Sequence, residues 1–161
     1  MTGKLLLRIS SALLFVHLIG HSFGNAGWKK ATDPVKMQVI HLMTGPKFPF
    51  MGVDRSMGEY YEGYGYITSA ALVLMIVLLW LASNHMATRN VFARQAGVTI
   101  GTLLVVIALL EFVYFFPFAA IISLFAGLLA IGAWFLSKTQ QASISSPAPA
   151  PPPPPSSATG R

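Results

Sequence analysis

Four long apolar runs dominate this sequence of 161 residues. Each run holds 18 to 20 residues, and together they contain one carboxylate, Glu111; they cover residues 5–23, 66–83, 97–116 and 118–136. At a rise of about 1.5 Å per residue, helices of this length span about 27–30 Å, which matches a hydrocarbon core of about 30 Å. Transmembrane barrel strands would instead show about 10 residues of alternating hydrophobicity. The runs therefore predict an all-α, polytopic membrane protein with a four-transmembrane-helix bundle.

The composition narrows the possible function classes. The chain is 54% hydrophobic and 10% charged, whereas soluble proteins carry about 25% charged residues. It has no cysteine, which excludes disulfides and thiolate metal sites. The net charge of +6 comes from basic residues scattered near helix ends and in one loop, so we expect no nucleic-acid partner. The partner that the composition predicts is the lipid bilayer.

One membrane domain, residues 1–137, is predicted to carry the fold. Residues 138–161 pass into a Pro/Ala/Ser-rich tract that cannot build a core, which predicts a disordered tail. Pro117 suits the first turn of a helix, so the last two spans should form an antiparallel hairpin. Lys4 and Arg8 precede the first run, as in a secretory signal peptide. Two histidines in that run and the lack of a small-residue cleavage site favour a retained helix.

The loop of residues 24–65 carries its own helix signals. Asp33 as an N-cap and Pro34 at the first helical position predict a short amphipathic helix over residues 34–43, lying on the membrane face or capping the bundle. Ser56 and Glu59 form a Ser-x-x-Glu capping box. The second spanning helix should therefore begin at Ser56, ahead of its lipid-crossing part.

The basic residues predict an orientation. With four spans, both termini and the link between the second and third spans share one side. That side carries Lys4, Arg8, Arg89, Arg94 and Lys138, and the other carries Lys29, Lys30, Lys36, Lys47 and Arg55. The first set lies closer to the spans, and basic residues close to the membrane weigh most. We expect cytoplasmic termini and a multi-pass membrane protein.

Two histidines stand on one face of the first span. His17 and His21 are four residues apart, and Ser10, Gly20 and Gly24 lie on or near the same face. This stripe of polar and small residues should face protein. The spacing resembles half of a metal site, but the helix offers no third ligand. We weigh metal or haem ligation, hydrogen bonding inside the bundle and proton handling at the membrane interface. We favour hydrogen bonding and predict no cofactor.

Small residues follow one face of each of the last two spans. On the third span that face carries Gly97, Gly101, Leu104, Ala108 and Glu111, and on the fourth Ala119, Ser123, Gly127 and Ala130. Small residues let membrane helices approach closely. The two spans should therefore pack tightly, with Glu111 projecting from the contact.

Glu111 needs a partner, because an isolated buried carboxylate is too costly to keep ionised. The candidate ligand or polar-cluster residues that could converge near it are His17, His21, Arg55, Glu59, Tyr61 and Glu111 itself. We predict that Arg55 is the partner, since its planar guanidinium can bind a carboxylate through two bonds. His17, His21 and water are the alternatives, and no residue is assigned a catalytic role.

The segment before the second span is the most individual stretch. It carries Gly-x-x-Arg-Ser, an acid, two aromatic residues, one variable residue and Gly-aromatic-Gly, formed by Gly52, Arg55, Ser56, Glu59, Tyr60, Tyr61, Gly63, Tyr64 and Gly65. This pattern resembles an uncharacterised family of small bacterial four-helix inner-membrane proteins. The resemblance implies the fold and a location in the bacterial inner membrane, and it implies no established activity. Glu62 stands at the variable position, and Tyr60 and Tyr64 also suit an aromatic belt.

Three function classes remain. We favour a non-catalytic protein that binds a lipid-like or quinone-like ligand, or an accessory subunit that joins a membrane-protein partner or forms a homo-oligomer. One alternative is a small intramembrane enzyme, an isomerase or oxidoreductase, with Glu111 and His17 or His21 as acid–base groups. Another is a transporter component, which would need oligomers because the chain shows no inverted repeat. No nucleophile motif, phosphate loop or dinucleotide fingerprint is present.

Overall fold

The computed structural model describes residues 2–86 and 90–144. Within these residues the elements follow in the order α1 (Gly3–Gly27), α2 (Pro34–Thr44), β1 (Phe48–Phe50), β2 (Val53–Arg55), α3 (Met57–His85), α4 (Val91–Tyr114) and α5 (Pro117–Ile144). Helices α1, α3 and α4 and the Pro117–Leu136 part of α5 are long and apolar enough to cross a membrane. The expectation of a helical bundle with four such helices is confirmed.

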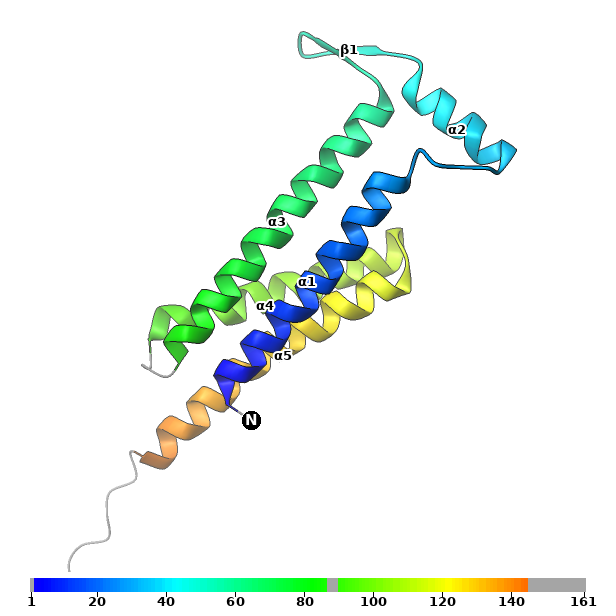
Figure 1. The fold of residues 1–161 in the computed structure, drawn as a ribbon. Helices are drawn as coiled ribbons and strands as arrows, with labels where there is room; N and C mark the ends of the chain where they lie inside the picture. Colours follow the sequence, from blue (N-terminus) through cyan, green and yellow to red (C-terminus); the bar gives the residue numbers. More distant parts are fainter. Residues whose placement is uncertain (1, 87–89, 145–161) are drawn as a thin grey trace, which may run out of the picture.

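The long helices form two pairs. Helix α1 packs against both α3 and α5, and α4 packs mainly against α5. Figure 1 shows α1 and α3 running side by side, with the α4–α5 hairpin lying across the lower part of this pair. Helix α2 and the β-hairpin lie together beyond the upper ends of α1 and α3. The chain thus places its small elements at one end of the bundle, opposite the N-terminus.

The α4–α5 hairpin is held by a close backbone crossing. A Cβ added to Gly101 would lie 2.8 Å from the carbonyl oxygen of Gly127, and a Cβ added to Gly127 would lie equally close to the carbonyl oxygen of Gly101. Neither position has room for a side chain. The small residues expected to line this contact are buried on both helices: Gly97, Gly101, Ala108, Ala119, Ser123, Gly127 and Ala130. The predicted close packing of the two helices is confirmed at Gly101 and Gly127, whereas a Cβ added to Gly97 would meet Leu7 of α1.

Two serines tie α1 to its neighbours. Ser10 Oγ donates a hydrogen bond to the carbonyl oxygen of Ala126 on α5 at 2.7 Å, and Ser11 Oγ donates to that of Ile76 on α3 at 3.0 Å. Both serines are buried, next to the fully buried Leu7 and Leu14. Interhelical bonds of this kind average about 0.6 kcal/mol in membranes. They favour the rotation of α1 that turns the two leucines into the core.

The expected small-residue stripe on α1 stops at His17. We predicted that Gly20 and Gly24 would continue the face of His17 and His21 against the bundle. That prediction is wrong, because both glycines are exposed and a Cβ on either would meet no atom of the described residues within 4 Å. The reason is visible in Figure 1, where the α4–α5 hairpin diverges from the upper part of α1.

The helix starts follow the local sequence signals. The Asp33 side chain accepts a hydrogen bond from the Lys36 backbone N–H, with Pro34 in the first turn of α2. Ser56 and Glu59 form both bonds of the capping box at the start of α3. Pro117 begins α5, as predicted. An unpredicted cap is Asn90, whose side chain accepts from Phe92 and Ala93 at the start of α4.

The segment between α2 and α3, part of the loop of residues 24–65, is a β-hairpin that we did not predict. Phe48 pairs with Arg55 and Phe50 with Val53 in an antiparallel register. The two-residue turn has φ of 47° at Met51 and 87° at Gly52. Tight hairpin turns need positive φ at their central residues, and glycine adopts it without strain. The Gly52 of the sequence motif is explained by this turn.

Helix α5 also runs further than expected. We placed the start of a disordered tail at residue 138, whereas the helix continues to Ile144. The reason is local, because residues 138–144 contain neither proline nor glycine and the first proline after them is Pro147. The rest of the predicted tail, residues 145–161, lies outside the described residues.

Candidate functional site

Three helices contribute one side chain each to a buried polar cluster of His17, Glu111 and Ser123. The Nε2 atom of His17 lies 3.4 Å from Oε1 of Glu111, and its Nδ1 atom lies 3.1 Å from Oγ of Ser123. His17 is 7% exposed and Ser123 is fully buried. A neutral imidazole protonated at Nε2, the nitrogen that faces Glu111, can accept a hydrogen bond from the Ser123 hydroxyl at Nδ1. One tautomer thus satisfies both contacts of the histidine.

His21 lies beside this polar cluster but bonds elsewhere. Its Nε2 atom is 3.0 Å from the carbonyl oxygen of Gly65 on α3. It stands four residues after His17, one turn further along α1. The two histidines therefore have separate tasks: His17 links α1 to the α4–α5 hairpin, and His21 links α1 to α3. The hydrogen-bonding role that we favoured for the pair agrees with these contacts.

The contact partner of Glu111 is His17, and the predicted partner Arg55 is elsewhere. Arg55 Nη1 lies 3.8 Å from Oε1 of Glu59, and Lys47 Nζ lies 3.7 Å from the same oxygen. Both basic groups, one just before the β-hairpin and one at its end, thus lie next to a carboxylate in the first turn of α3. The predicted Arg55–Glu111 pair is wrong, because the α4–α5 turn does not reach the end of the bundle where the β-hairpin lies (Figure 1).

The polar cluster has the chemical groups of a nucleophilic site but not the access. A hydroxyl, an imidazole and a carboxylate in series can activate a serine for attack. Ser123 Oγ, however, is enclosed by helices, and its residue has no exposed surface. A substrate would have to separate α1 from α5 to reach it. The second carboxylate oxygen of Glu111 is also buried, without a hydrogen-bond partner among the residues that the structure describes. The contacts suit a link between helices.

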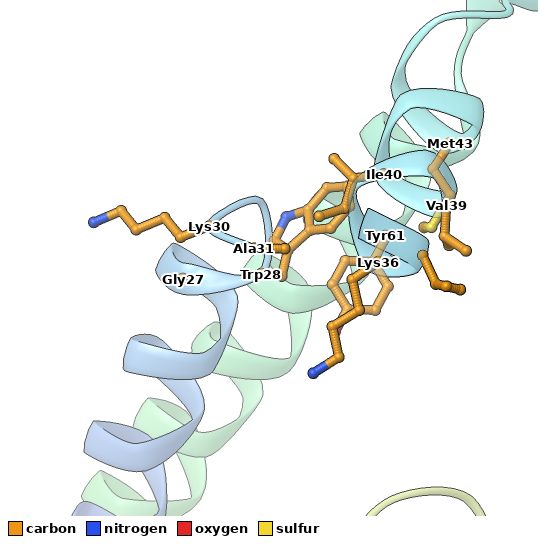
Figure 2. Close-up of a pocket in the computed structure, with 10 residues that line it drawn as sticks. Gly27, Trp28, Lys30, Ala31, Lys36, Val39, Ile40, Met43 and Tyr61 are labelled. Atoms are coloured by element: carbon orange, nitrogen blue, oxygen red, sulfur yellow. The ribbon is translucent and has the colours of Figure 1, made fainter. Parts of the chain in front are cut away.

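A pocket of about 500 Å³ lies at the end of the bundle opposite the N-terminus, between the end of α1, helix α2 and the start of α3. We refer to it as the α2 pocket. Most of its lining is apolar or aromatic, with two lysines; the lining residues are Gly27, Trp28, Lys30, Ala31, Val35, Lys36, Val39, Ile40, Met43 and Tyr61. Figure 2 shows Trp28, Tyr61 and Ile40 gathered at its centre. Of the predicted candidates, Tyr61 alone belongs to this pocket.

Close packing of α2 on α3 creates the α2 pocket. A Cβ added to Gly58 would lie 3.0 Å from Thr44 Cγ2, 3.1 Å from the Trp28 ring and 3.2 Å from the Met43 carbonyl oxygen. The absence of a side chain at Gly58 therefore lets α2 and Trp28 approach the start of α3. The Trp28 and Tyr61 rings then meet with centroids 5.0 Å apart. The sequence signal for this site is one aromatic residue on each side of the loop, Trp28 after the first span and Tyr61 before the second.

The charges around the α2 pocket are unevenly paired. Lys29 Nζ lies 2.7 Å from Glu62 Oε1 and 5.4 Å from the Trp28 ring centroid. Lys47 and Arg55 share Glu59. Lys30 and Lys36 are exposed and form no ion pair with the described part of the chain. The two lysines that line the pocket are thus the ones whose charge is not balanced by an ion pair with the described residues.

Comparison with known proteins adds no constraint. No protein family, curated protein or solved structure matches this chain. Among the residues that the structure describes, no three histidine or carboxylate side chains come close enough to hold a metal ion. The functional argument therefore depends on the polar cluster and the α2 pocket.

Proposed function

We propose that this chain is an integral membrane protein that binds a lipid-like or quinone-like molecule in the α2 pocket. Four helices have the length and apolarity for a bilayer span. The resemblance of residues 52–65 to small bacterial four-helix proteins and the membrane-proximal basic residues support an inner-membrane location with cytoplasmic termini. An accessory-subunit or homo-oligomeric role is compatible with this proposal.

The lining of the α2 pocket is the observation that carries the proposal. Ligand pockets of about 300–1,000 Å³ are typically apolar with a few polar groups that orient the ligand. The α2 pocket has a volume of about 500 Å³ and combines aliphatic side chains with Trp28, Tyr61 and two lysines. This size admits part of an amphipathic molecule, such as a quinone ring or a headgroup with the start of its chain.

The position of the α2 pocket also suits an amphipathic ligand. It lies where α1 ends and α3 begins, which in a bilayer would be the level of the headgroups. Trp28 and Tyr61 are residue types enriched at that level. On α2, Val35, Val39 and Leu42 lie on one face and are exposed. An apolar chain leaving the pocket would find this stripe and the surrounding lipid next to it.

The enzyme and transporter alternatives have weaker support. Acid–base catalysis by Glu111 and His17 would need a substrate within reach of groups that are buried between helices. His21 is engaged with a backbone carbonyl of α3. A transport path would need polar groups aligned through the bundle, and the described polar groups of the bundle interior bond mainly across adjacent helices. We therefore rank ligand binding first.

Native mass spectrometry of the detergent-extracted protein tests the proposal. We expect one lipid-like or quinone-like molecule to remain bound per chain. Val39→Asn places an amide in the pocket lining and should release it. Met37→Asn is the matched control, because Met37 is an exposed apolar residue of the same helix that does not line the pocket. Equal retention by both variants, or no retained molecule in the parent protein, would contradict the proposal.

A further inference from the structure

We infer that the α2 pocket selects an anionic phospholipid, with Lys30 and Lys36 at its mouth contacting the charged headgroup. This inference rests on the proposed function and specifies its ligand. Three observations lead to it: which basic groups lack partners, where carboxylates are missing, and how the apolar surface continues from the lysines.

The first observation is which basic side chains lack an ion-pair partner among the described residues. The segment of residues 24–65 carries five basic side chains, Lys29, Lys30, Lys36, Lys47 and Arg55. Three of them lie within ion-pair distance of Glu59 or Glu62. The other two, Lys30 and Lys36, line the pocket. An ammonium group next to an apolar surface attracts an anion that brings its own apolar part.

The second observation is the absence of acid from the pocket. No residue of its lining is Asp or Glu. The nearest acid in the sequence, Asp33, uses its Oδ1 atom to accept the backbone N–H of Lys36 at 2.9 Å, as the N-cap of α2. Glu62 is 2.7 Å from Lys29. A bound anion would therefore meet two cations without a carboxylate in the lining that repels it.

The third observation is the arrangement of charge and apolar surface. Figure 2 shows Lys36 passing beside Tyr61 and Lys30 on the far side of Trp28, with the two ammonium groups pointing outward from the apolar lining in different directions. Long lysine side chains can cover apolar surface with their methylenes while the charge stays in the polar region. A phospholipid matches this order, with a phosphate at the mouth and acyl chains along Val35 and Val39. Free phosphate would leave the apolar lining unused, and a neutral quinone would leave the lysines unused.

The test uses Trp28 as a reporter. The protein has three tryptophans. In the Trp80→Phe/Trp134→Phe background, Trp28 in the pocket lining is therefore the one tryptophan that remains. This variant is reconstituted in phosphatidylcholine vesicles that contain a minor, equal fraction of either brominated phosphatidylglycerol or brominated phosphatidylcholine. Bromine quenches tryptophan fluorescence at short range. We expect the anionic lipid to quench Trp28 preferentially. Each lysine should raise the apparent affinity for this lipid over phosphatidylcholine by roughly 5-fold.

The matched variants separate the pocket from general attraction. Lys30→Gln/Lys36→Gln in the same background should abolish the preference, and both side chains are exposed, so the fold should be retained. Lys47→Gln/Arg55→Gln removes the same charge from the same loop and should keep the preference. If both double variants lose it equally, the selection does not come from the pocket and the inference fails.

Two further outcomes distinguish the inference from the proposed function. Equal strong quenching of Trp28 by both brominated lipids would overturn anionic selection and leave lipid binding in the pocket intact. Quenching that is weak for both lipids would overturn lipid binding itself. Excess inorganic phosphate should leave the preference unchanged; if phosphate abolishes it, the site binds phosphate and the assignment to a phospholipid is wrong.

Discussion

His17 Nε2 lies 3.4 Å from Glu111 Oε1, which links α1 to α4 through a pair of side chains that can both carry charge. Both are largely enclosed, with 7% and 13% of their side-chain surface exposed. A buried polar group that loses its partner keeps its desolvation penalty, whereas replacing both partners by apolar groups can be nearly neutral. The two residues should therefore be strongly coupled.

The first prediction concerns this coupling. His17→Leu or Glu111→Leu alone should lower the free energy of unfolding by about 1–3 kcal/mol, because each leaves one buried polar group unpaired. The double change should lose clearly less than the sum of the two. Reversible unfolding in detergent, followed by circular dichroism, measures the cycle. Additive losses would mean that the two side chains do not depend on each other.

Arg55 provides the control for this cycle. It is about half exposed and its nearest carboxylate is Glu59 at 3.8 Å. Exposed ion pairs contribute about 0–1 kcal/mol, so Arg55→Met should have a small effect. In the double variant Arg55→Met/Glu111→Leu, the losses of unfolding free energy from the two single changes should simply add. A large coupling between these two positions would show that Arg55 is the partner of Glu111, as expected from the sequence, and that His17 is not.

The sequence was informative where the cause is local. The Asp33 cap, the Ser56–Glu59 capping box and the helix start at Pro117 need only a few adjacent residues, and all three are present. The crossing at Gly101 and Gly127 also follows from residue size, because a face without side chains can accept a neighbouring backbone. These features required no knowledge of which helices cross where.

The partner of Glu111 could not be read in the same way. Its identity depends on where the α4–α5 hairpin meets α1, which is a property of the whole bundle. Ser123 was expected on the packing face, but its bond to His17 follows from the rotation of α1. The α2 pocket likewise arises only when α2 folds back over Gly58. Long-range packing decided each of these, and no short pattern encodes it.

The second prediction tests the α4–α5 crossing. In Gly101→Ala the new Cβ would lie 2.8 Å from Gly127 O and 2.9 Å from Ile131 Cγ1, so the helices must move apart. Overpacking of this kind costs about 1–3 kcal/mol. Gly20→Ala is the control, because nothing lies within 4 Å of its Cβ and alanine favours a helix by up to about 1 kcal/mol. Thermal unfolding should show opposite shifts for the two variants, and equal shifts would refute the crossing.

The third prediction concerns the orientation. The loop of residues 24–65 and the N-terminus lie at opposite ends of the α1–α3 pair (Figure 1). If the membrane-proximal basic residues decide the sidedness, a reporter fused after Lys47 should be periplasmic, and reporters fused after Arg94 or Lys138 cytoplasmic. Alkaline phosphatase and fluorescent-protein fusions give complementary readouts. The reverse pattern would show that the loop, with its α2 pocket, faces the cytoplasm.

The last prediction concerns the contact of Gly65 with Asn25, near the upper ends of α1 and α3. The Asn25 side chain occupies the space that a Cβ of Gly65 would fill, and His21 lies 3.0 Å from the carbonyl oxygen of Gly65. Gly65→Ala should therefore destabilise the α1–α3 contact, whereas Gly63→Ala, with nothing within 4 Å of its Cβ, should gain up to about 1 kcal/mol.

Removing the obstructing side chain should rescue the Gly65→Ala variant. Asn25→Ala shortens the group that the new Cβ meets, so it should raise the stability of the Gly65→Ala variant. In the parent protein the same change only removes a packed side chain and should not stabilise the fold. Coupling of about 0.5–3 kcal/mol is usual for residues in direct contact. Unfolding of the four proteins in one detergent measures it. If Asn25→Ala has the same effect in both backgrounds, the two residues do not touch, and the requirement for glycine at position 65 must come from another neighbour.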